Sequence, residues 1–164
     1  MESILQPFLD IMREVYIGAE GQHTFVIDNA PGNGILSAIK TVSAKEASTP
    51  SHEGGSTIAA HTGHLKWSLD YAMEFLRGNQ PQWDWDDSWK RIVVNDSEWQ
   101  ELQQELEETY NRIATAIREV KDWSHPAFAK GVLALLPHAA YHLGAIKQLM
   151  LVTKHHEKAA IGLQ

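Results

Sequence analysis

Residues 57–77 read TIAAHTGHLKWSLDYAMEFLR and form the clearest helical pattern in the chain. At about 100° per residue, the apolar side chains of this stretch fall on one side together with His61 and His64. Charged side chains such as Lys66 and Asp70 fall on the opposite side. Because a helix of this kind buries its apolar side, we expect both histidines to point toward a core.

Three further stretches repeat apolar residues at the helical period, at 5–16, 99–120 and 126–152. We expect the helix around 99–120 to open at Asp96-Ser97, with Ser97 and Gln100 as a capping box. The last helix contains Pro137, which should kink it.

The region before residue 57 has weaker patterns. Residues 18–34 are rich in glycine, asparagine and proline and predict a loop, in which 25–27 is the place for a short strand. A short accessory helix is expected from 35 to about 47.

Four long amphipathic helices predict an all-α fold of the four-helix-bundle type. About twenty residues separate the second of these helices from the third. Such a link is long enough to travel the length of a ~30 Å helix, so we expect a crossover with helices two and three parallel. The length of the chain fits one domain, residues 1–164.

Composition excludes several classes of protein. The chain has 21 acidic and 14 basic residues, a formal charge of -7 and no basic stripe, so nucleic-acid binding is not expected. No apolar run approaches the ~20 residues of a membrane span. Residues 1–4 lack the features of a secretory signal, which predicts a cytoplasmic protein. With no cysteine, any thiol chemistry must use a cosubstrate.

The last helix carries His138-Ala-Ala-Tyr-His142, whose two imidazoles are four residues apart and can converge on one ion. The alternative is a pair of packed histidines, because this spacing is common. A buried neutral imidazole needs partners for both ring nitrogens, and a core of Leu, Ala and Gly side chains offers few, which favours a metal. His61 or His64 would be the third ligand, and spacing does not choose between them.

Three tryptophans, Trp83, Trp85 and Trp89, lie within seven residues of the expected crossover. They would either cap a site or hold a long loop against the bundle, and the second interpretation is favoured.

Two motifs together resemble those of the DinB/YfiT-like superfamily, and the resemblance covers nearly the whole chain. In that family a Ser/Thr-Ile/Val helix start is followed seven residues later by a histidine, as from Thr57 to His64. The second motif, His-x-x-x-His-Leu-Gly-x-Ile, is matched from His138 through His142 to Ile146. The resemblance implies that His64, His138 and His142 bind nickel or zinc, with His61 as a neighbour, in a bundle that is often dimeric.

The resemblance also implies a metal-dependent enzyme acting on a small molecule. Named activities of the family include S-transfer and maleylpyruvate isomerisation with low-molecular-weight thiols. We expect S-transfer with a small thiol cosubstrate, which suits a chain without cysteine. The alternatives are a hydrolase in which the ion activates water, and a non-catalytic bundle that binds a metal or a partner. His61 or Tyr141 would orient the bound group.

Overall fold

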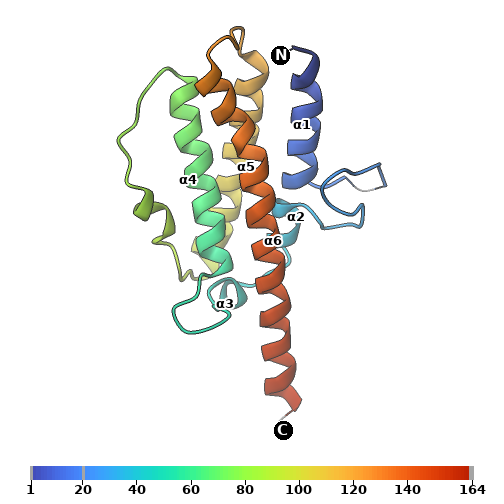
Figure 1. Ribbon diagram of the computed structural model, residues 1–164. Coiled ribbons are helices and arrows are strands. Elements are labelled where there is room, and N and C mark those ends of the chain that lie inside the picture. The colour runs from blue at the N-terminus through green and yellow to red at the C-terminus, as the bar shows by residue number, and fades with distance from the viewer. Residues whose placement is uncertain (1, 20, 163–164) are drawn as a thin grey trace.

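The computed structural model describes residues 2–19 and 21–162, with side chains described for 4–19 and 21–154, and this part of the chain is all-helical (Figure 1). The elements are α1 (Glu2–Tyr16), α2 (Ile35–Ile39), α3 (Ala44–Ala47), α4 (Ile58–Leu76), the 3-10 helix η1 (Trp85–Trp89), α5 (Asp96–Glu119) and α6 (Pro126–Gly162). The predicted all-α class is confirmed. No described helix combines the length and the low polarity that crossing a membrane requires.

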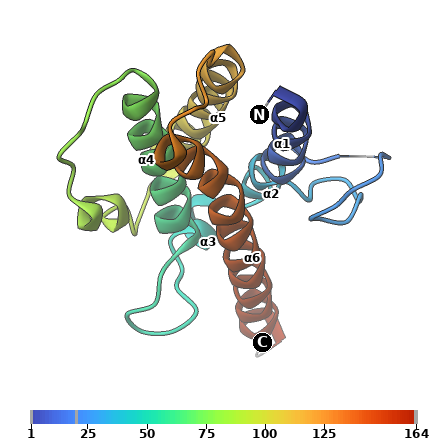
Figure 2. The ribbon, with the colours of Figure 1, turned by 45° about the horizontal axis from the view of Figure 1, so that its top comes forward.

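The four long helices pack against one another through a shared core (Figures 1 and 2). α4 contacts both α5 and α6, and α1 contacts α5 and α6. Figure 1 shows α4 and α5 running in the same direction, because segment 77–95 returns along the outside of the helices from the end of α4 to the start of α5. η1 lies within this segment and packs against α4. The C-terminal part of α6 extends beyond the other helices.

Each long helix contributes apolar side chains that are completely buried. Examples are Met12 on α1, Leu65 on α4, Leu106 on α5 and Ile146 on α6, all 0% exposed. Burying one such side chain contributes about 1.5–3 kcal/mol of transfer free energy. The apolar stripes in the sequence are therefore the faces that hold the helices together.

The start of α4 is bonded to Ile92, near the end of segment 77–95. The Thr57 hydroxyl oxygen accepts a hydrogen bond from the Ala60 amide at 3.1 Å, which caps the helix. The same hydroxyl donates to the carbonyl of Ile92 at 2.7 Å. One side chain thus fixes where α4 begins and where segment 77–95 ends.

The predicted capping box of Ser97 and Gln100 is wrong. α5 begins two residues earlier, where Asn95 accepts from the Glu98 amide at 3.0 Å and Glu98 accepts from the Asn95 amide at 2.8 Å. Ser48 holds the residue before this cap, because its hydroxyl accepts from the Val94 amide at 2.9 Å and donates to the Val94 carbonyl at 3.2 Å. Val94 is thereby kept outside the helix, so α5 starts no earlier than its Asn95 cap.

Two expectations for the N-terminal region also change. The accessory helix is divided into α2 and α3, because Ser43 and Glu46 form a capping box that starts a new helix. Residues 25–27 form no strand in the described structure, since their three amides donate instead to the buried carboxylate of Glu14 at 2.6–3.1 Å.

In the last helix, α6 continues through Pro137 without a break.

Candidate metal centre

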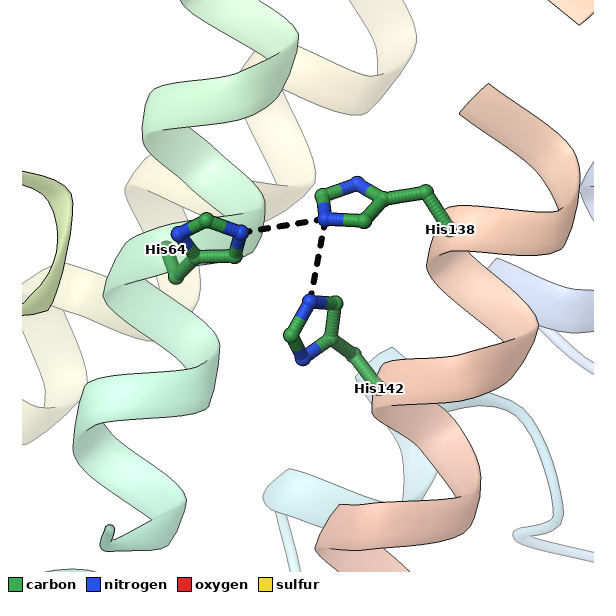
Figure 3. Close-up of side chains that lie close together, drawn as sticks. All are labelled: His64, His138 and His142. Carbon is green, nitrogen blue, oxygen red and sulfur yellow. Dashed lines mark hydrogen bonds between the residues drawn. The ribbon is translucent and has the colours of Figure 1, made fainter. Parts of the chain in front are cut away.

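Three imidazoles from two helices meet between α4 and α6. His64 lies in the middle of α4, and His138 and His142 lie one turn apart on α6 (Figure 3). The Nε2 atom of His138 is 3.0 Å from Nε2 of His64 and 3.0 Å from Nε2 of His142. One ligand atom from each residue lies within 4.8 Å of the other two. His64 and His142 are 0% and 2% exposed, and His138 is half-buried.

The outer nitrogen of His64 is bonded to segment 77–95. Ser88 on η1 is buried, and its hydroxyl donates to the carbonyl of Trp85 at 2.6 Å. The hydroxyl has only one hydrogen, so at the 2.8 Å contact with His64 its oxygen must accept from Nδ1–H. In its neutral form, His64 therefore presents a lone pair on Nε2 to the other two rings.

The outer nitrogen of His142 is bonded to His61. The two Nδ1 atoms are 2.8 Å apart, and Nε2 of His61 is 2.9 Å from the hydroxyl oxygen of Ser56. When His142 donates to His61 and His61 donates to Ser56, the Nε2 lone pair of His142 faces the cluster. His61 has both ring nitrogens engaged elsewhere, so the structure places His64 in the cluster and His61 behind His142.

Burial keeps all four imidazoles neutral at pH 7. Burial, with a smaller contribution from the neighbouring imidazoles, lowers the pKa of His64 to about 4 and that of His142 to about 3. Burial also lowers the pKa values of His61 and His138. Neutral imidazoles are the form that binds metals.

This set of donors fits a divalent ion. A neutral His138 carries at most one hydrogen on Nε2, yet this atom faces two nitrogens at equal distances. Hydrogen bonds among the rings therefore satisfy the cluster incompletely, whereas one cation accepts three lone pairs. Histidine nitrogens about 2.0–2.1 Å from zinc at tetrahedral angles are roughly 3.3 Å apart, close to two of the observed separations.

The tryptophans of segment 77–95 hold the segment on α4 and also cover the cluster. Trp83 lies 5.6 Å from Trp67 of α4, measured between ring centroids. Trp89 stacks on His64 at 4.2 Å and 17°, and Trp85 meets the same imidazole edge-on at 4.9 Å. Both interpretations of the sequence therefore describe part of the structure, with Trp85 and Trp89 forming a wall beside His64.

Tyr141 and His125 are not members of the cluster, although the ring of Tyr141 meets that of His142 edge-on at 5.0 Å. Tyr141 is 71% exposed, and in the described structure its hydroxyl makes no hydrogen bond to a histidine. His125 accepts from the Phe128 amide at the start of α6. Sequence reasoning missed Ser56 and Ser88, because a single serine in a loop carries no signal.

The fold and the cluster define a class, that of all-helical proteins with a three-histidine candidate metal centre. Within this class the chain belongs to the DinB superfamily, because a model of that family matches residues 33–146. The match covers more than half of the chain and includes all three histidines. No curated protein and no solved structure matches the chain.

Proposed function

We propose that the chain is a divalent-metal-dependent enzyme in which His64, His138 and His142 hold nickel or zinc. The observation that carries this proposal is the convergence of three neutral ring nitrogens, two of them 3.0 Å from the third. Among the described residues, no fourth histidine, aspartate or glutamate joins the group. Three protein ligands are typical of catalytic sites, because they leave a position for a reactant.

The reaction proposed is S-transfer to a small electrophile from a low-molecular-weight thiol. The chain has no cysteine, so the sulfur has to come from a cosubstrate. In this reaction the sulfur forms a bond to the electrophilic carbon, the leaving group departs with its electron pair, and the thiol proton passes to solvent. A divalent ion in such a site supplies Lewis acidity, which lowers the pKa of a thiol that it binds.

The protein's own residues have three tasks in this proposal. Ser88 and His61 keep the rings of His64 and His142 oriented with Nε2 toward the centre. Trp89 covers the face of His64 and keeps water from that side. His138 is half-buried and lines a cavity, so reactants would approach from its side.

The architecture belongs to the same proposal. We take α1, α4, α5 and α6 as the four-helix bundle of the family, with segment 77–95 as its crossover and one domain over residues 1–164. The contacts among the long helices support this. The family resemblance favours a homodimer, which light scattering would measure.

Metal analysis tests the ligands directly. Protein purified without a metal-affinity column should contain about one equivalent of nickel or zinc per chain by mass spectrometry. His142→Ala should lose the metal, whereas His52→Ala should retain it, because His52 is exposed in a loop away from the cluster. Equal metal content in parent and His142→Ala would refute the assignment.

Thiol consumption tests the reaction. The metal-loaded protein is incubated with an electrophile and small thiols, and loss of thiol is compared with that in chelated protein and in His142→Ala. Faster loss only in the loaded parent supports S-transfer. Product formation without thiol loss would contradict S-transfer and support hydrolysis, and unfolding on chelation would support a structural ion.

A further inference from the structure

A cavity of about 620 Å³ lies between α4 and α6, beside the three histidines. Its walls come from the second half of α4 and the first half of α6, with Trp85 of η1 at one side. His138 is both a member of the cluster and part of the cavity wall. The volume is in the range of sites for small organic molecules.

One wall of the cavity is aromatic and leads to the cluster. Trp67 stacks on Tyr71 with ring centroids 5.0 Å apart and an angle of 7°. Tyr71 meets Phe75 edge-on at 5.1 Å, and Trp67 meets Trp85 edge-on at 5.5 Å. Trp85 in turn contacts His64. A flat ring in the cavity would therefore find aromatic surfaces along its length.

The described part of the cavity wall carries no charged side chain. The described residues that line it include no lysine, arginine, aspartate or glutamate, and its polar members are Ser68, Tyr71, Gln80, His125 and His138. A second cavity, of about 670 Å³ beneath the crossover, differs, because Lys66, Arg91 and Glu105 line it and form ion pairs. A charged group that loses its water needs an opposite charge, so the walls of the first cavity away from the histidines favour the uncharged part of a ligand.

We infer that this cavity binds the electrophilic substrate, and that the substrate has a flat, uncharged aromatic body along the cavity walls and its reactive group beside His138. The inference rests on the proposed function, because that function supplies the reaction. Binding of the aromatic body depends on the cavity walls and needs no metal. It can therefore be measured separately from the metal site.

Calorimetric titration of the full chain tests the inference with 2-naphthol and naphthalene-2-sulfonate. The two probes share a ring system. The second carries a negatively charged sulfonate, which is a weak metal ligand, in place of the neutral hydroxyl. Both zinc-loaded and chelated protein should bind 2-naphthol. The chelated protein, which holds no ion that attracts an anion, should bind the sulfonate at least tenfold more weakly. Equal affinity of the chelated protein for the two probes would overturn the inference.

Gly131 offers a variant that fills the cavity without damaging the helix. It lines the cavity, and a Cβ atom built on it meets no atom within 4 Å. Gly131→Leu should lower the affinity for 2-naphthol at least tenfold. Gly144→Leu is the matched control, because Gly144 lies on the same helix, has equal space and does not line the cavity. The affinity of Gly144→Leu for 2-naphthol should stay within twofold of that of the parent.

Metal content separates the two proposals. Gly131→Leu should keep its metal while losing 2-naphthol, and His142→Ala should lose its metal while keeping 2-naphthol. A parent that binds zinc but neither probe would overturn the inference and leave the proposed function standing. If, in addition, Gly131→Leu changes a dimer into a monomer, the cavity is filled by a second copy of the chain.

Discussion

Replacing His61 by alanine should weaken metal binding although His61 is not in the cluster. With an ion at Nε2, His142 must carry its proton on Nδ1, and this proton is donated to His61 at 2.8 Å. His142 is 2% exposed, so bulk solvent does not reach its Nδ1, and a new acceptor would have to be a water trapped in the space that His61 leaves. Without a metal the proton can move to Nε2 and bond to His138. The penalty therefore falls on the metal-bound state alone.

The size of the effect follows from the cost of a buried donor without a partner, about 1–3 kcal/mol. Since each 1.4 kcal/mol corresponds to tenfold in affinity, this predicts a loss of roughly 5- to 150-fold. Losses of about 10- to 100-fold are usual when the outer hydrogen-bond partner of a metal-binding histidine is removed.

Competition for zinc against a chromophoric chelator measures the effect. His61→Asn is a control expected to stay within about threefold of the parent, because its amide oxygen can accept from His142. His61→Phe keeps a ring beside Trp89, which contacts His61 at 5.3 Å, but removes the acceptor, so it should behave like alanine. A folded His61→Ala that binds zinc as tightly as the parent would refute the reasoning.

Three further predictions concern stability. Glu14→Ala should lower the free energy of unfolding by about 2 kcal/mol in urea, because three backbone amides lose their acceptor, and an unchanged midpoint would contradict this. Asn95→Ala should cost about 1 kcal/mol and Ser97→Ala less than about 0.5 kcal/mol, and the reverse order would show that Ser97 is the cap. Burial lowers the pKa of His64 to about 4 and that of His142 to about 3, below the ~6.5 of an unfolded chain. At pH values between the folded and the unfolded pKa, the unfolded state therefore binds more protons than the folded state. The melting temperature of chelated protein should therefore fall as the pH drops below about 6.5, and equal values at about pH 7.5 and 5 would argue against neutral buried rings.

Apolar periodicity predicted the long helices because their buried faces are continuous. Within α4 the buried residues, such as Leu65, are spaced so that only a helix places them on one side, and the same holds for Leu106 and the buried residues of α5. This pattern is local to each segment. Helix starts were harder to predict. Asn95 and Ser97 both fit the capping template, and the template does not choose between them. The contact that keeps Val94 outside the helix comes from Ser48, which is 46 residues away in the chain.

The candidate site was predictable only in part for the same reason. Periodicity placed His61 and His64 on the buried side of α4, but which of them meets His138 depends on where α6 packs. The family resemblance favoured His64, and the structure brings this residue into the cluster. The role of Ser88 had no local signal, because it depends on segment 77–95 folding back onto α4. Ser56 directly precedes the Thr57 cap, and a single serine at a helix start does not reveal a bond to His61.

Segment 77–95 lies on the outside of the molecule, yet it supplies Ser88, the outer partner of His64. Occupancy of the cluster and order of this segment are therefore thermodynamically linked, since each favours the other by the same free energy. A substitution anywhere along the segment that shifts η1 would alter how tightly the cluster retains an ion, although the substituted residue does not contact that ion. In a DinB-superfamily protein of this kind, variation in that loop is a route to tuning the centre while its three histidines stay the same.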